Sequence, residues 1–202
     1  MRDNDYVITT KELVQWCQEE GLDLDKITPS KFDSVLGEGT GAGMIFGNTG
    51  GVMEAALRTV YRVLEGKEAP ADFYQLRPVR GLSNRKEAEV TIAGKKLRVC
   101  ILYGKAASEE FLAEDMNGYH FVEVMTCPGG CISGAGQPDC GSVPVSDVVR
   151  KKRIQSLYQA DEQAERRNSM DNPEIGTIYH EFFKEPLSML SEKLLHTTYK
   201  RK

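Results

Sequence analysis

The segment Cys127-Pro-Gly-Gly-Cys131 restricts this chain most, because it sets two thiols and two glycines directly after an apolar stretch, residues 120–125 (HFVEVM). Flexible glycine backbone between two thiols lets both sulfur atoms face one centre. Thiolates of this kind are typical ligands of iron–sulfur clusters and of zinc. The spacing therefore predicts a tight turn with two metal ligands, Cys127 and Cys131. A redox disulfide or two inert thiols are the simpler alternatives.

The other three cysteines do not complete a ligand set in an obvious way. Cys140 is close enough in sequence to be a third ligand, which would fit a zinc or redox-thiol module with Cys127 and Cys131. Cys100 lies in an apolar strand and Cys17 on the apolar face of a helix, so both are expected in the core. A [4Fe–4S] cluster and a tetrahedral zinc ion each usually take four ligands. The chain supplies no obvious fourth one.

A second glycine-rich loop, Phe46-Gly-Asn-Thr-Gly-Gly51, precedes an amphipathic helix, residues 52–66 (VMEAALRTVYRVLEG). Loops between a strand and a helix lie at the edge of an α/β sheet where ligands usually bind. A helix N-terminus also favours anions. The spacing matches neither G-x-G-x-x-G nor a P-loop, so a phosphate-binding loop and a tight packing turn both remain open.

Apolar periodicity predicts an α/β fold in which strands alternate with helices early and helices dominate late. Strands are expected at residues 5–9, 44–46, 79–82, 87–93, 96–103 and 120–125. Helices are expected at residues 10–20, 52–66, 108–116 and 147–167, from Asn172-Pro173 onward, and at 187–196. We expect a mostly parallel twisted sheet flanked by helices, with a β-hairpin turning at Gly94-Lys95 and a helical C-terminal tail.

Composition indicates which kinds of binding partner to expect. The formal net charge is −4, so the chain lacks the positive charge that would indicate binding to nucleic acid. No apolar run approaches the roughly 20 residues of a membrane span. The N-terminus lacks the apolar core of a signal peptide, and five cysteines make an odd count, so a cytoplasmic location without a disulfide framework is expected. Residues 1–145 are expected to form an α/β lobe carrying both loops, and residues 146–202 a helical tail on that lobe.

Both loops resemble a known family. The stretches FGNTGGVMEAALRTVY at 46–61 and FVEVMTCPGGCISGAGQP at 121–138 are similar to motifs of the iron-only ([FeFe]) hydrogenases. The opening DYVITTKEL and the tail NPEIGTIYHEFFKEPLSMLSEKLLHTTY are also similar to that family. The resemblance covers nearly the whole chain and implies the C-terminal half of the catalytic domain, one lobe of it.

The resemblance also implies a cofactor, the H-cluster, in which a [4Fe–4S] cubane is bridged to a di-iron unit with CO and cyanide ligands. Cys127 would ligate the cubane, and Cys131 would ligate the cubane and bridge to the di-iron unit. Met125 would lie beside the di-iron unit, although an ordinary core position is the simpler alternative. Phe46 and Gly47 would line the same pocket.

The family's remaining cluster-binding motifs precede the segment at 5–10 (DYVITT), so the ligand set of this chain is expected to be incomplete. The resemblance then implies the N-terminal half of the catalytic domain as a partner and ferredoxin or a similar electron carrier. It implies reversible reduction of protons to hydrogen, with no activity from this chain alone. A non-enzymatic relative used in iron–sulfur assembly or hydrogen sensing is the alternative.

Overall fold

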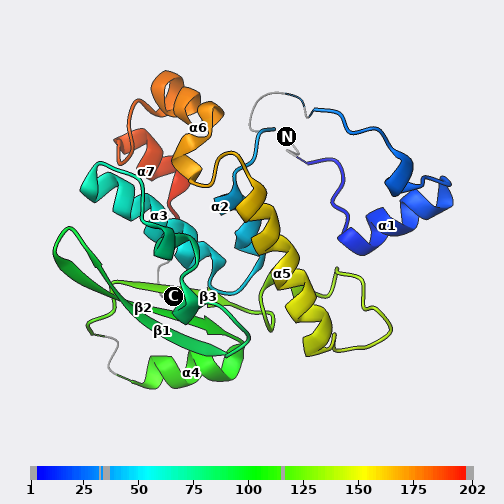
Figure 1. Ribbon diagram of the computed structural model, residues 1–202, viewed down its shortest axis with the longest axis horizontal. Coiled ribbons are helices and arrows are strands. Elements are labelled where there is room, and N and C mark those ends of the chain that lie inside the picture. Colours follow the sequence, from blue (N-terminus) through cyan, green and yellow to red (C-terminus); the bar gives the residue numbers. More distant parts are fainter. Residues whose placement is uncertain (1–3, 32, 34–36, 115–116, 199–202) are drawn as a thin grey trace.

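A small three-stranded sheet covered by helices forms the body of the protein in the computed structural model, which describes residues 4–31, 33, 37–114 and 117–198 (Figure 1). The strands are β1 (Arg85–Ile92), β2 (Lys95–Tyr103) and β3 (Phe121–Met125), in the order β1-β2-β3. The pair β1–β2 is antiparallel and the pair β2–β3 is parallel. The α/β fold is thus confirmed, but the sheet is mixed rather than mostly parallel.

The predicted hairpin between β1 and β2 is present, but its turn lies one residue earlier than expected, because Lys95 already pairs with Ile92 as the first residue of β2. Its two turn residues, Ala93 and Gly94, have positive φ values of 50° and 73°. Positive φ at both central positions is the geometry of a type I′ turn, which matches the twist of antiparallel strands.

Helices cover both faces of the sheet. They are α1 (Thr10–Glu19), α2 (Gly41–Met44), α3 (Gly51–Glu65), α4 (Lys105–Ala113), α5 (Asp147–Gln163), α6 (Pro173–Ile178) and α7 (Met189–Leu195). On one face α3 packs Met53 and Leu57 against Ile92 and Ile101 of the sheet. On the other face α4 packs Phe111 against a cluster that includes Cys100, Leu102 and Ala107. Cys100 is fully buried there, as expected.

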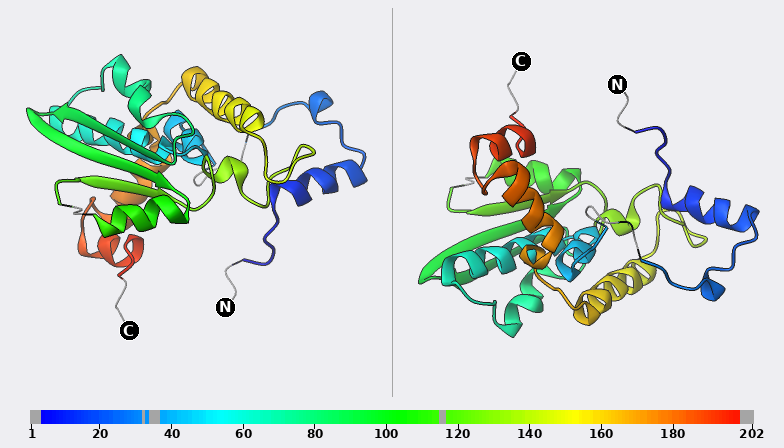
Figure 2. Two further views of the ribbon diagram at one scale, coloured as in Figure 1. Left: turned by 90° about the horizontal axis from the view of Figure 1, so that it is seen from below. Right: turned by 90° about the horizontal axis from the view of Figure 1, so that it is seen from above.

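Helix α5 runs diagonally across the body, in contact with α2 and beside the start of α3 (Figures 1 and 2). Its N-cap is Ser146, whose side chain accepts a hydrogen bond from Val149 N. The chain then turns through α6, a π-helical turn at Tyr179–Phe183 and α7. Within the described ranges, none of the helices combines the length and apolar character needed to cross a bilayer.

Helix α1 projects away from the body (Figure 1). A capping box begins this helix, because Thr9 and Glu12 exchange hydrogen bonds there. None of its residues is buried, and Trp16 is 58% exposed. The expectation that Cys17 is a core residue is therefore wrong, since it is only half-buried on a helix with no layer beneath it.

Three expected strands are not strands among the described residues: those at 5–9, 44–46 and 79–82. Residues 5–9 are exposed and have no strand partner. Residues 44–46 form the end of α2 and a 3-10 turn, Ile45–Gly47. The third stretch begins with the last residue of a 3-10 turn, Arg77–Val79, in which Pro78 suits the first helical turn, and residues 80–82 form no strand.

Candidate metal centre

The two glycine-rich loops meet, as the shared pocket implied by the family resemblance requires. Thr49 N in the first loop donates a hydrogen bond of 3.0 Å to Gly129 O in the second. The first loop follows a 3-10 turn rather than a strand, so only the second arrives from the sheet, at the end of β3. Segments about 80 residues apart in sequence thereby form one rim.

Two glycines permit this close approach. Gly130 has φ of 100°, and a Cβ atom there would lie 2.6 Å from Gly47 O and 2.8 Å from Thr49 N. A Cβ atom on Gly47 would lie 2.9 Å from Leu157 Cδ1 of α5. A side chain at Gly130 would separate the two loops, because the atoms it meets are backbone, whereas one at Gly47 would clash only with the movable end of the Leu157 side chain.

The expected site residues gather around this rim. Cys127 is half-buried and Cys131 is exposed. Met125 ends β3 and is half-buried, and Phe46 is 45% exposed. Cys131 and Gly47 share a cavity of about 460 Å³. Met125, Phe46 and Cys127 do not line that cavity.

Cys140 does not join the two cysteines of the turn. It is exposed, has φ of 53°, and its Sγ accepts a hydrogen bond of 3.4 Å from Arg153. In the part of the chain that the structure describes, no three His, Cys, Asp or Glu side chains lie close enough to hold a metal ion. The zinc or redox-thiol module of Cys127, Cys131 and Cys140 is therefore not formed.

Glu123 fixes the first loop from β3. Its carboxylate is 5% exposed and accepts hydrogen bonds from Gly50 N at 2.6 Å and Met53 N at 2.7 Å. These amides belong to the first turn of α3, which a carboxylate stabilises as an N-terminal cap. Burial nevertheless raises the pKa of Glu123, against the opposing effect of these hydrogen bonds.

Lys86 holds the same loop from β1. Its Nζ donates to Thr49 O at 3.0 Å, Thr49 Oγ1 at 3.3 Å and Gly81 O at 3.1 Å. Desolvation lowers the pKa of Lys86 to about 8, and the charge of Glu123 opposes this shift. Lys86 and Glu123 were not foreseen, although a carboxylate inside the apolar run at 120–125 was an available signal.

Helix α5 contributes two arginines to the second loop. Arg153 Nη1 donates to Ile132 O at 2.6 Å, and its Nη2 donates to Pro138 O. Arg150 Nε donates to Ser133 Oγ at 3.2 Å. Neither contact was foreseen, because the charged side chains of such a helix are expected to face solvent.

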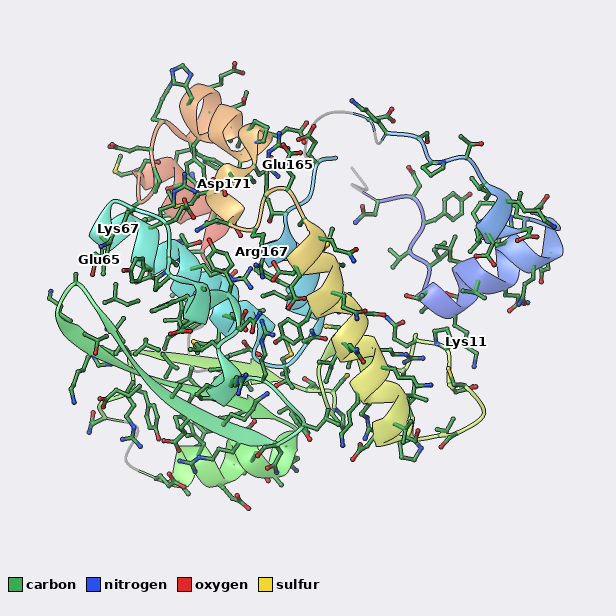
Figure 3. The ribbon with its side chains drawn as sticks, viewed as in Figure 1. Lys11, Glu65, Lys67, Glu165, Arg167 and Asp171 are labelled. Atoms are coloured by element: carbon green, nitrogen blue, oxygen red, sulfur yellow. The ribbon has the colours of Figure 1, made fainter. Side chains whose placement is uncertain are left out.

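A buried charge network joins α5 to α3. Arg58 is fully buried and donates to both oxygens of Asp161, each at 2.8 Å, and to Glu54 at 2.7 Å. Arg167 adds a bond of 2.6 Å to Asp161 from the chain just after α5, where Figure 3 labels it. Burial alone would raise the pKa of Asp161, but the hydrogen bonds from Arg58 and Arg167 outweigh it and lower that pKa. Arg80 also binds Glu54 and stacks 3.6 Å from the ring centroid of Tyr158.

Family comparisons bear directly on these loops. Residues 1–135 match the model described as "Iron only hydrogenase large subunit, C-terminal domain". The chain belongs to the iron-only hydrogenase family. Residues 147–202 match a second model of these hydrogenases, "Iron hydrogenase small subunit", which begins at the first residue of α5.

Individual hydrogenases and relatives agree with this assignment. "Iron hydrogenase 1" of Clostridium pasteurianum is 38% identical over 205 residues, covering 100% of this chain and 35% of its own length. A structure of [FeFe]-hydrogenase HydA1 from Chlamydomonas reinhardtii superposes with a TM-score of 0.72 at 33% identity, covering 96% of this chain and 55% of its own. "Cytosolic Fe-S cluster assembly factor narfl" of Xenopus tropicalis is 29% identical, covering 98% of this chain and 41% of its own. The chain thus spans about a third of the length of the Clostridium pasteurianum hydrogenase.

The donor set fits part of an iron–sulfur site. Cys127 and Cys131 are two thiols in one turn, and Cys131 opens onto a cavity. Thiolates are the usual ligands of such clusters. Asn48, in the facing loop, is 1% exposed, and neither of its amide atoms has a hydrogen-bond partner among the described residues. Two thiols are half of the usual four, so a cluster here would need further ligands from outside these residues.

Proposed function

We propose that this chain is the C-terminal part of an [FeFe] hydrogenase catalytic domain and that Cys127 and Cys131 ligate its iron–sulfur cluster. The observation that carries the proposal is the junction of the two family motifs. Thr49 N bonds Gly129 O, which holds the cysteine turn against the first loop beside a cavity that Cys131 lines.

We assign the other residues of the rim by the family resemblance. Cys131 would also bridge the cubane to the di-iron unit, which makes it catalytic together with Met125. Met125 would contact the di-iron unit with a polarisable thioether. Phe46 and Gly47 would line the pocket that holds it. Phe46 suits a role against another surface, because the described residues leave it 45% exposed.

When bound, the cluster would supply the redox chemistry of reversible proton reduction, with electrons from a ferredoxin-type carrier. The chain's own residues would ligate it, orient it and keep water away. Lys86 and Glu123 would fix the first loop so that its backbone stays close to the cysteine turn. The remaining ligands would come from the N-terminal half of the catalytic domain.

We further propose a cytoplasmic location and a division into a lobe, residues 1–145, and a helical tail, residues 146–202. The two family matches meet near this boundary, at 135 and 147, which supports the division.

The test uses the full-length gene product that contains this chain, produced anaerobically with hydrogenase maturation factors. Infrared bands of iron-bound CO and cyanide, together with hydrogen evolution, are expected. Cys131→Ser should abolish both, and Cys127→Ser should lower the iron content. Cys140→Ser is the matched control and should change neither. Wild-type activity in Cys131→Ser would contradict the proposed ligand.

Iron–sulfur assembly is the second candidate, because the similarity to the assembly factor of Xenopus tropicalis covers 98% of this chain. The higher identity to the Clostridium enzyme, 38% against 29%, favours the hydrogenase. A stable cluster without any CO or cyanide band in the same preparation would favour assembly.

A further inference from the structure

Arg153 joins α5 to the stretch that follows Cys131 through three hydrogen bonds. One guanidinium nitrogen donates to Ile132 O and the other to Pro138 O and to Cys140 Sγ. The two carbonyls lie on either side of the glycine-rich stretch that follows Cys131. A planar guanidinium with donors in fixed directions holds two such points at a set separation.

The charge of Arg153 is placed at the site itself. Its side chain is half-buried and lines the same cavity as Cys131 and Gly47. Among the described residues, its hydrogen-bond acceptors are two carbonyls and a thiol, and no carboxylate pairs with it. Arg150, one helical turn earlier, differs because Asp147 binds its guanidinium at 2.5 Å. The cavity therefore faces one uncompensated positive charge.

We propose that Arg153 is a positioning residue of the cluster site, which holds the turn after Cys131 in place and sets a positive charge beside the cluster. The inference rests on the proposed function, since it concerns the group that Cys127 and Cys131 bind. It assigns a role in the cluster site to α5, which belongs to the segment matching the small-subunit model.

Two consequences follow from physical chemistry. A turn that loses two carbonyl contacts should open more often, so its amides should exchange hydrogen faster. Reduction adds negative charge to a cluster, so a nearby cation favours the reduced form and raises the reduction potential. Loss of Arg153 should therefore lower that potential.

The experiment compares four full-length proteins: wild type, Arg153→Gln, Arg153→Lys and the control Lys152→Gln. Lys152 is exposed on the same helix and is adjacent in sequence, so its variant removes one charge without touching the turn. Hydrogen exchange of residues 131–138 is measured in iron-free protein. The midpoint potential of the reconstituted cluster is measured by redox titration with electron paramagnetic resonance.

Arg153→Gln should raise exchange across 131–138 several-fold and favour the oxidised cluster about tenfold, which corresponds to about 59 mV for one electron. Arg153→Lys should keep the potential near that of the wild type but still raise exchange. Lys152→Gln should match the wild type in both. Arg153→Gln that matches Lys152→Gln in exchange and potential would overturn the proposal.

If Arg153→Gln fails to fold, Arg153→Lys decides: raised exchange supports the proposal and wild-type exchange contradicts it. Failure of the proposed function looks different, because the wild-type protein itself would then bind no iron–sulfur cluster.

Discussion

Lys86 is a cation held inside the protein by three oxygen atoms, two of them backbone carbonyls. It is 7% exposed, and desolvation lowers its pKa to about 8 from an ordinary value of 10.5. Between those values the folded protein has released a proton that the unfolded chain still binds. Unfolding therefore becomes less favourable as pH rises through that window.

The comparison of the wild type with Lys86→Met tests this linkage. The unfolding free energy of the wild type minus that of the variant should increase by up to roughly 3 kcal/mol as pH rises from 8 to 10.5. Below pH 7 this difference should be constant. Urea unfolding at a series of pH values measures it. Lys95→Met, at the exposed first position of β2, is the control and should leave the difference in unfolding free energy independent of pH over this window. A difference independent of pH would mean that Lys86 stays protonated throughout.

Gly130 is the residue on which the junction of the loops depends. Its φ of 100° and the 2.6 Å between an added Cβ and Gly47 O leave no room for a side chain. Gly130→Ala should lower stability by about 2 kcal/mol and sharply reduce iron binding by the full-length protein. Thermal unfolding and iron analysis measure the two effects. Gly176→Ala is the control, because a Cβ there meets nothing within 4 Å. Equal iron content in both variants would refute the dependence.

Among the helices, α3 and α5 are linked by the buried ion pair of Arg58 with Asp161. Removing one partner leaves the other charge buried without its counterpart, which is costly. Asp161→Asn should therefore lower stability by about 3 kcal/mol, measured by urea unfolding at pH 7. Glu162→Gln, at the exposed neighbouring position, should change it little. Because the pKa of Asp161 is lowered in the folded protein, its contribution begins to fade as pH falls below its ordinary value of about 4 and is lost only as pH falls through the lowered value, where the two variants should converge.

Sequence periodicity located the helices and strands whose own residues show a clear apolar spacing. The alternation in β1, the apolar run of β2, the amphipathic α3, the helix α1 and the start of α6 at Asn172-Pro173 were all recognisable. Short apolar runs were not reliable, because five apolar residues fit a strand, a helix end or an extended tail equally well. Residues 5–9 and 44–46 failed for that reason.

The candidate site also has features that the sequence predicts and features that it does not. Its two loops were predictable, since the spacing of glycine and cysteine is local information. The side chains that hold the loops were not, because Lys86 reaches Thr49 across 37 residues and Glu123 reaches Gly50 across 73. Nothing in a charged helix indicates that Arg153 bonds Ile132 O. Such contacts are consequences of the fold rather than of local pattern.

At the scale of the whole molecule, several large apolar side chains around α1 are exposed among the described residues. Tyr6 is 92% exposed, Val7 87% and Trp16 58%, all in the segment around α1. That segment reaches the body through few contacts, including Lys11 N to Gly136 O and the ion pair of Lys11 with Asp139; Figure 3 labels Lys11 beside the loop it binds. Soluble monomers seldom leave such patches bare.

We therefore expect the chain on its own to be marginally stable and to self-associate. Covering about 400 Å² of apolar surface would contribute roughly 10 kcal/mol, comparable to the stability of a whole domain. Size-exclusion chromatography and thermal melting, with and without an N-terminal hydrogenase half, measure the effect. Trp16→Gln with Val7→Gln should reduce self-association and also weaken rescue by that half, because the same surface serves both. A sharp, monomeric, high-melting species formed by the unaltered chain alone would show that α1 needs no partner.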